Sequence, residues 1–211
     1  PRYEPLDLKD LGALQRMLAS VEADFGGIDI LINNAANDDR HALEVVTPEY
    51  WDDRMAVNLR HFFFAAQAVM GAMKRAGGGV ILNFGSISWH LGLPNMALYQ
   101  TAKAGIEGLT RALARDLGEF NIRVNTVVPG QLHTPMVEAR LAGQRAGGGG
   151  VTATVGPPAS GPAPPSSPQA VVVASAASRA SEGRTNIDAV YAAPAGACDD
   201  AACPRRRNRG T

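Results

Sequence analysis

The chain has 211 residues, with 20 basic and 20 acidic side chains and a formal net charge of +0. This length suits one domain with an appendage, and the neutral balance argues against a protein that mainly binds a nucleic-acid backbone or an anionic membrane. No apolar run reaches the roughly 18–20 residues of a membrane-spanning helix and no signal-like segment opens the chain, so we expect neither a membrane nor a nucleic-acid partner.

The first part of the chain predicts alternating helices and strands. Asp10 is placed to cap a helix whose apolar residues recur every three or four positions, and Gly26-Gly27 stops it. The run 28–35, rich in Ile and Leu, is typical of a short strand buried on both faces. Thr47-Pro48 marks the start of a second helix, which we expect to extend with a break or bend to about Arg75. Three further segments continue the alternation: a strand at 80–86, a helix at 98–118 and a strand at 122–130.

Strands that alternate with helices of this length predict right-handed crossovers and a parallel sheet. We therefore expect an α/β fold, a partial Rossmann-like doubly wound parallel sheet with helices on both faces. In such a sheet, ligands bind beyond the carboxyl ends of the strands. Three groups of residues follow the predicted strands and should lie there: Asn33-Asn34-Ala35, Ser86 and Pro129-Gly130.

Tyr99 and Lys103 are four residues apart on a predicted helix, so their side chains should project from one face. A phenol, with an ordinary pKa of about 10, is a poor acid or base at neutral pH, but a nearby ammonium favours the phenolate and lowers that pKa. Ser86 ends the preceding strand and can hydrogen-bond an oxygen held beside the phenol. Taken alone, a tyrosine and a lysine at helical spacing are more often an ordinary surface pair.

Five motifs occur in order between Asp7 and Met136: Asn33-Asn34-Ala35, Asn58, Ser86, Tyr99-x-x-x-Lys103 and Pro129-Gly130. This series resembles the short-chain dehydrogenase/reductase family. Within that family, the runs 37–41 (NDDRH) and 83–93 (NFGSISWHLGL) resemble those of bacterial aldose dehydrogenases of the xylose type. The resemblance implies an oxidoreductase that transfers hydride between NAD or NADP and a small-molecule alcohol or carbonyl substrate, which could be a sugar.

The resemblance also implies a role for each residue at the reacting centre. Tyr99 would be the acid/base that exchanges a proton with the substrate oxygen. Lys103 would lower the tyrosine pKa and hold the nicotinamide ribose hydroxyls. Ser86 would polarise the substrate oxygen, and Asn58 would hold a water that relays the proton. These four are the expected catalytic residues.

The resemblance places the expected cofactor-binding residues on either side of this centre. Besides Tyr99 and Lys103, they are Asp7, Leu8, Asn33, Asn34, Ala35, Pro129, Gly130 and Thr134. Trp89 and His90 follow Ser86 and could line a substrate pocket, although loop packing explains them about as well. The family commonly forms homo-oligomers, but a shortened sheet argues against assembly of this chain.

The sequence departs from the family pattern at its start. The family's first βαβ unit, whose glycine-rich turn binds the pyrophosphate, should precede Asp7, and no comparable turn precedes a helix in the sequence. We therefore expect an amino-terminally truncated domain, and the alternative hypothesis is a catalytically inactive fragment without a complete cofactor site. The matching prediction is weak cofactor binding and little turnover by this chain alone, which micromolar binding of NAD or NADP in a calorimetric titration would contradict.

The composition changes at about Gly143. From there on the chain is rich in Gly, Pro, Ala and Arg and holds a single aromatic residue, Tyr191. Such a segment has too little apolar surface to offset the entropy of ordering it. We therefore divide the chain into a partial domain at 1–143 and an unrelated tail at 144–211 that is disordered or weakly structured. Within the tail, 171–175 could form a strand only if a partner sheet accepts it.

The remaining candidate residues carry weak signals. The four histidines are scattered, with no two at metal-ligand spacing on a helix, so we expect no metal. Cys198 and Cys203 make neither a disulfide framework nor a four-ligand zinc site, and a reducing cytoplasm is the default location. The arginines near the end of the chain leave open a third hypothesis, a binding protein recruited through its tail.

Overall fold

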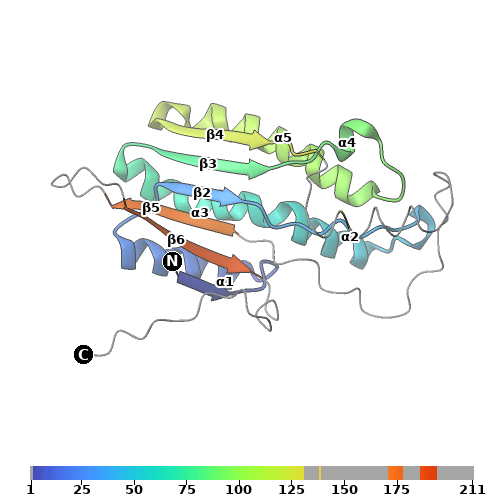
Figure 1. Cartoon of the computed structure of the whole chain (residues 1–211), viewed down its shortest axis with the longest axis horizontal. Helices are drawn as coiled ribbons and strands as arrows, with labels where there is room; N and C mark the ends of the chain where they lie inside the picture. The colour runs from blue at the N-terminus through green and yellow to red at the C-terminus, as the bar shows by residue number, and fades with distance from the viewer. Residues whose placement is uncertain (1, 131–137, 139–170, 178–185, 194–211) are drawn as a thin grey trace.

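The computed structural model describes residues 2–130, 138, 171–177 and 186–193. Within these residues, one sheet has the strand order β1-β6-β5-β2-β3-β4 (Figure 1). The strands are β1 (Arg2–Pro5), β2 (Ile30–Asn33), β3 (Gly79–Phe84), β4 (Ile122–Val127), β5 (Val171–Ala177) and β6 (Asn186–Ala193). Strands from the beginning, middle and end of the chain therefore lie side by side.

The strands β2, β3 and β4 are parallel neighbours, which confirms the expected α/β fold with a parallel sheet. Leu31, Ile81 and Val124 are aligned across these three strands, and all three are buried. In β4 the buried residues alternate with exposed ones, so that Arg123 and Asn125 face the opposite side of the sheet. The apolar side of the parallel strands is the side against which the helices pack.

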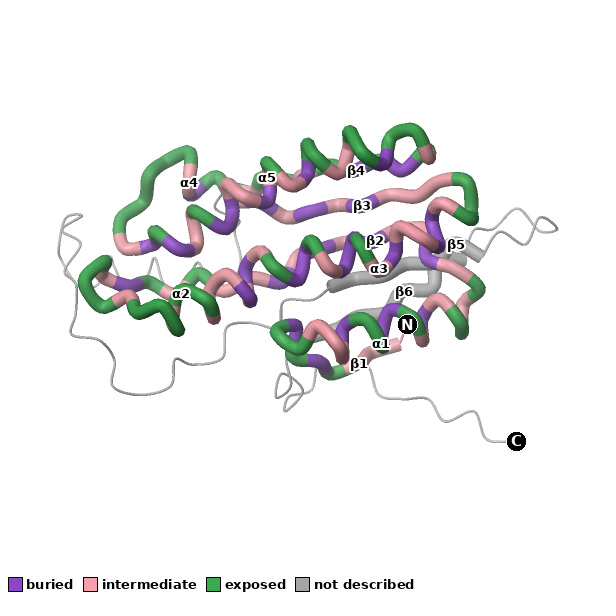
Figure 2. Tube along the Cα trace, turned by 180° about the vertical axis from the view of Figure 1, so that it is seen from behind, coloured by how far each residue is buried: buried purple, intermediate pink, exposed green. Residues whose placement is uncertain are grey.

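We expected helices on both faces of the sheet. In the described part of the chain, the long helices lie along one side of it, behind it in Figure 1 and in front of it in Figure 2. The described helices are α1 (Leu11–Phe25), α2 (Pro48–Met55), α3 (His61–Ala76), α4 (Ser88–Leu91) and α5 (Ala97–Leu117). Shorter turns are the 3-10 turns η1 (Leu43–Val45) and η3 (Gly118–Phe120) and the π-helical turn η2 (Ala56–Arg60). None of the described helices is both long and apolar enough to cross a bilayer.

The predicted helix boundaries are confirmed where the sequence holds capping residues. The Asp10 side chain accepts a hydrogen bond from Ala13 N at 2.9 Å, and α1 ends at Gly26, whose φ of 77° lies in the left-handed region. Thr47 Oγ1 accepts from Tyr50 N at 3.2 Å and so caps α2. The expected break in the second helix is η2, which separates α2 from α3.

The hydrophobic core lies between the parallel strands and the helices α1 and α3. Among the apolar residues that recur every three or four positions in α1, Leu14, Leu18 and Val21 are at most 1% exposed. They pack in one cluster with Val69 and Met73 of α3. This packing fixes α3, and with it the turn η2 that precedes it.

The strands β5 and β6 come from the segment 144–211, which we expected to be disordered or weakly structured. β5 pairs antiparallel with β2, and β6 pairs antiparallel with β5 and parallel with β1. The expected condition for a strand at 171–175, a sheet that accepts it, is therefore met, because unpaired N–H and C=O groups at a strand edge favour a further strand. The other residues of the tail lie outside the described part of the chain, so the boundary at 143 stays a prediction.

Candidate functional site

The carboxyl ends of β3 and β4 hold Ser86 close to the turn that follows β4. Gly85 N donates to Val127 O at 2.8 Å, and Ile87 N donates to Pro129 O at 3.1 Å. These two bonds continue the pairing of the parallel strands past their ends. Ser86 lies between them and is thereby fixed at the edge of the sheet where ligands of such folds bind.

Helix α5 carries Tyr99 and Lys103 on one face, as their spacing predicts. Lys103 Nζ lies 5.4 Å from the centre of the Tyr99 ring and 5.6 Å from that of Phe62 on α3. Lys103 is 2% exposed, and its Nζ donates to Phe84 O, at the end of β3, at 2.7 Å. The pair is therefore not an ordinary surface pair, because its ammonium is enclosed between the sheet, α3 and the phenol.

Burial controls the pKa of both side chains. It lowers the pKa of Lys103 to about 8. Burial also raises the pKa of Tyr99, a hydrogen bond with Ser86 lowers it, and the negative charge of Asp38 raises it again. The resemblance implied a tyrosine pKa lowered by Lys103, and in this structure the net direction is the opposite. The physical reason is that desolvation of the phenolate outweighs the hydrogen bond with Ser86, while the Lys103 ammonium donates to the Phe84 carbonyl.

Asn58 lies in η2, where the helix widens into a π-helical turn. Its side chain is fully buried, and Oδ1 accepts from Asn37 N at 2.7 Å. Among the residues that the structure describes, Nδ2 of Asn58 has no hydrogen-bond partner. Leaving a buried donor unpaired costs about 1–3 kcal/mol, so this amide is suited to donate to a small polar molecule. That it holds a relaying water stays a prediction.

His61, which directly follows η2, is a buried polar residue that our sequence analysis did not single out. It is fully buried, with Nδ1 3.3 Å from Ala56 O. Burial lowers the pKa of His61 to about 4, in spite of the Ala56 carbonyl, which raises it, and the charge of Lys103 lowers it further. Its burial could have been expected from its place at the start of a long apolar helical segment.

His61 should make the folded chain less stable in mild acid. Above pH 6.5, the ordinary pKa of the group, the imidazole is neutral in the folded and the unfolded chain. As the pH falls from 6.5 to about 4, the unfolded chain takes up a proton that the folded chain excludes, so the free energy of unfolding decreases. The full difference is about 3 kcal/mol. Urea unfolding over this pH window should show a smaller decrease in His61→Phe than in the wild type.

Two measurements check this expectation. The matched control is His90→Gln, which removes an exposed imidazole and should keep the wild-type pH dependence. Proton NMR titration of His61 gives the pKa directly, whether or not the His61→Phe chain folds. A His61 resonance that titrates near the ordinary value of histidine would contradict the expectation.

The Asn33 side chain joins a buried polar network rather than opening onto the surface. Its Nδ2 donates to Asn83 Oδ1 at 2.9 Å, and Asn83 Nδ2 donates to Thr110 Oγ1 at 3.0 Å. Thr126 Oγ1 lies 2.6 Å from the same Thr110 oxygen. The network therefore connects β2, β3, α5 and β4.

The other expected cofactor residues lie at two separate places. Asp7 and Leu8 follow β1; Asp7 is exposed and accepts from Lys9 N at 2.9 Å, whereas Leu8 is 8% exposed. Asn34 is half-buried and Ala35 is buried, directly after β2. Because β6 and β5 lie between β1 and β2, these two places are three strand spacings apart, about 14 Å.

The two expected substrate residues pack against helix α5. Trp89 Nε1 donates to Glu107 Oε1 at 2.7 Å, and His90 Nε2 lies 3.2 Å from the same oxygen. The rings of Trp89 and His90 are in contact, with centres 3.8 Å apart and planes inclined by 33°. These contacts account for both rings as loop packing, and contact with a substrate stays a prediction.

The residues at the carboxyl ends of β2 to β4 fit one end of an extended dinucleotide. Lys103 and Tyr99 offer donors for ribose hydroxyls. Asn58, whose Nδ2 has no partner among the described residues, lies beside the loop that follows β2, because Asn37 N donates to it. Asp7 follows β1, at the opposite edge of the sheet from β4. The three strand spacings between Asp7 and Asn34 suit a long ligand. In the described part of the chain, however, α1 begins behind an acidic cap, Asp10, which does not suit a pyrophosphate. Thr134 lies outside the described residues.

Comparison with known proteins places this site in a family context. A family model described as enoyl-(acyl carrier protein) reductase matches residues 2–149. The D-xylose 1-dehydrogenase of Caulobacter vibrioides is 56% identical over 138 residues, which are 65% of this chain and 54% of that protein. The "Probable galactose dehydrogenase GalD" of Rhizobium meliloti is 49% identical over 134 residues, 64% of this chain and 52% of that protein.

Solved structures agree with the family model. A structure from Burkholderia xenovorans that is assigned to the short-chain dehydrogenases/reductases matches with a TM-score of 0.60 and 33% identity. The match covers 65% of this chain and 53% of that one. The chain thus spans about half the length of the curated relatives and the solved structure that it matches.

Proposed function

Because the chain belongs to the short-chain dehydrogenase/reductase family, we propose that it carries the reacting centre of an NAD- or NADP-dependent oxidoreductase. The substrate class is an alcohol or the corresponding carbonyl compound, and a sugar in particular. The observation that carries the proposal is the enclosure of Lys103 beside the Tyr99 ring, 5.4 Å from its centre, next to Ser86 at the end of β3.

Tyr99 moves the proton in this proposal. In the direction of reduction its hydroxyl donates to the substrate oxygen, and in the direction of oxidation it takes the hydroxyl proton. Since burial raises the pKa of Tyr99, the phenol is protonated at neutral pH and ready to donate. Lys103, with a pKa of about 8, can accept or release a proton near neutral pH. The water that Asn58 would hold is the next member of the proposed relay.

The other residues orient the reacting groups. The nicotinamide, when bound, supplies or accepts the hydride. Lys103 Nζ and the Tyr99 hydroxyl are the donors that would hold its ribose hydroxyls, and Pro129 and Gly130 would face the nicotinamide ring. Ser86 would donate to the substrate oxygen and fix its distance from the phenol.

The proposed sugar substrate rests on the relatives. A D-xylose 1-dehydrogenase and a galactose dehydrogenase are among the proteins most similar to this chain. The run NDDRH at 37–41, which we associated with aldose dehydrogenases, lies beside Asn58, because Asn37 N donates to it. An aldose is therefore the first substrate to test, ahead of simple alcohols.

One experiment separates this proposal from the alternative of an inactive fragment. Reduced nicotinamide is followed by its near-ultraviolet absorbance with D-xylose, D-galactose and simple alcohols, and with NAD or NADP. The 211-residue chain is compared with a fusion in which a glycine-rich βαβ unit of the family precedes Pro1. Turnover by both forms supports the proposal and excludes the alternative, turnover by the fusion alone supports the alternative for this chain, and turnover by neither overturns the proposal.

Removing the Ser86 hydroxyl should impair the reaction and move the tyrosine pKa. In Ser86→Ala, we expect turnover to fall by about 10²–10³-fold, as for the loss of one donor to a reacting oxygen. The pKa of Tyr99 should rise further, because the Ser86 hydrogen bond lowers it. Steady-state kinetics and tyrosine ring carbon NMR measure the two effects.

Ser88→Ala is the matched control for this variant. Ser88 Oγ lies 3.0 Å from Ser86 Oγ, so the variant removes a neighbouring hydroxyl without touching the phenol. It should change turnover by much less than Ser86→Ala does. Equal losses in the two variants would contradict the role assigned to Ser86.

A further inference from the structure

The helix that carries Tyr99 and Lys103 begins without a cap of its own. The residue at the capping position of α5 is Met96, which makes no side-chain hydrogen bond to the helix. The first N–H groups of any α-helix have no acceptor within the helix and need one from elsewhere. The acceptor in this structure comes from His41, a residue 57 positions earlier in the chain than Leu98.

His41 contacts the start of α5 through both its side chain and its backbone. His41 Nε2 accepts from Leu98 N at 3.4 Å, and His41 N donates to Asn95 O at 2.9 Å. Nδ1 lies 3.3 Å from Asp39 O, a carbonyl that can only accept. The geometry therefore requires a neutral imidazole with its proton on Nδ1, since a protonated Nε2 would face the Leu98 N–H.

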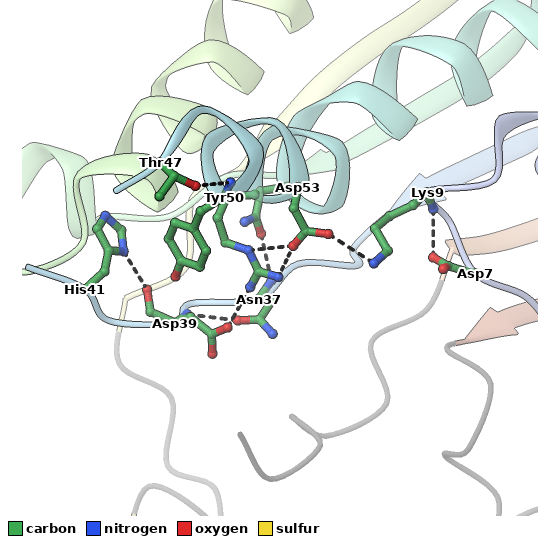
Figure 3. A network of polar contacts seen from close by, with 10 residues as sticks. Asp7, Lys9, Asn37, Asp39, His41, Thr47, Tyr50 and Asp53 are labelled. Atoms are coloured by element: carbon green, nitrogen blue, oxygen red, sulfur yellow. Dashed lines mark hydrogen bonds and ion pairs between the residues drawn. The ribbon is translucent and has the colours of Figure 1, made fainter. Parts of the chain in front are cut away.

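The loop 37–41 is tied to the rest of the active site at its other end. Asn37 N donates to Asn58 Oδ1 at 2.7 Å, and Asn37 Oδ1 accepts from Asp39 N at 2.9 Å. The Asp39 carboxylate pairs with Arg54 of α2 at 2.6 Å (Figure 3). The loop thus forms a polar bridge from Asn58 to the first turn of α5.

The charged and titratable groups around His41 fit a neutral ring. From α2, the Tyr50 ring meets it edge-on at 5.5 Å, and Arg54 is neutralised by Asp39. From its own loop, Arg40 donates to Pro94 O. His41 is 7% exposed, and an added positive charge at a helix amino terminus is unfavourable.

We propose that His41 is a positioning residue that, as a neutral Nδ1-protonated imidazole, caps α5 and fixes Tyr99 relative to Asn58. The catalytic consequence rests on the proposed function, whereas the cap itself does not. Part of the NDDRH run, which we associated with sugar substrates, would then serve to build the active site.

The first test reads the imidazole in the wild-type chain. Long-range proton–nitrogen NMR spectra distinguish the two neutral tautomers, and comparison with His41→Asn identifies the His41 signals. We expect the proton on Nδ1. A proton on Nε2, or on both nitrogens at neutral pH, would overturn the proposal.

The second test compares two variants by amide hydrogen exchange. His41→Phe keeps a ring against Tyr50 but has no acceptor, so the Leu98 amide should exchange about tenfold faster, while the Ile106 amide in mid-helix is unchanged. His41→Asn, whose side chain can accept, should restore most of the protection. Unchanged Leu98 exchange in His41→Phe would overturn the proposal, and if that variant does not fold, the tautomer measurement decides.

Kinetics then separate this inference from the proposed function. In a form that turns over an aldose, His41→Phe should lower kcat about tenfold with an unchanged KM, and His41→Asn should recover most of it. A kcat equal to that of the wild type would overturn the positioning role. If no form turns over any substrate while Leu98 exchange responds as expected, the proposed function fails and the cap remains.

Discussion

Replacing Tyr99 with phenylalanine is expected to remove nearly all turnover from any active form of this protein while leaving the fold unchanged. The substitution removes one oxygen from a half-buried ring on α5, and the ring itself still packs near Lys103. General acid–base catalysis by a positioned side chain contributes about 10²–10⁴-fold, so kcat should fall within this range. The measurement is steady-state kinetics with the preferred sugar, accompanied by circular dichroism.

The matched control is Tyr3→Phe, which removes the same hydroxyl from β1 at the other end of the sheet. It should leave kcat unchanged. If Tyr99→Phe retained more than about a tenth of the wild-type kcat, the proton would have to come from another group and the assignment of Tyr99 would be wrong.

Lys103→Met should have two opposite effects, a loss of turnover and a gain in stability. Methionine has nearly the same length and is apolar, so it fits a position that is 2% exposed. Turnover should fall by about 10²-fold or more, because the group that assists the phenol is lost. The free energy of unfolding at neutral pH should rise, provided that the Phe84 carbonyl finds another donor, such as water.

The stability effect depends on pH in a defined direction. Below about pH 8 the Lys103 ammonium is charged in the folded and the unfolded chain, and the folded state bears the whole cost of burying it. Between about 8 and 10.5, the folded chain loses the proton while the unfolded chain keeps it, so the free energy of unfolding increases with pH. The total increase is about 3 kcal/mol. Lys103→Met should lack it.

Denaturant unfolding of the two chains at several pH values measures this difference. The raised pKa of Tyr99 acts in the opposite direction at higher pH, so the comparison belongs below about pH 10. Lys74→Met, which replaces a half-buried lysine on α3, is the control and should keep the wild-type slope. A Lys103→Met chain with the same pH slope as the wild type would show that the ammonium is not desolvated.

The parts of the fold that the sequence predicted are those with a local physical cause. Asp10 and Thr47 cap helices because a short polar side chain reaches an N–H group three residues on. Tyr99 and Lys103 share a face because a helix repeats every 3.6 residues. Ser86 and Pro129 lie together because the carboxyl ends of parallel strands meet at one edge. Each of these features needs only the nearest few residues or a general rule of α/β topology.

The features that the sequence did not predict depend on partners far away in the chain. The composition of the segment 144–211 predicts no stable structure on its own, yet β5 pairs with β2. The composition of that segment says nothing about the edge of β2, which lies far away in the chain. Histidine is a polar residue type, and only the packing of α3 decides that His61 is buried and neutral. The fit of the expected cofactor residues likewise depends on how many strands separate Asp7 from Asn34.

The sequence by itself determined the order of the elements, the face shared by the tyrosine and the lysine, and the family to which these motifs belong. Only the tertiary structure decided the direction of the Tyr99 pKa and the residue that caps the helix carrying it. The physical reason is that spacing along a helix is set by bonded geometry, whereas desolvation and the contact of His41 with Leu98 arise only when distant segments pack together.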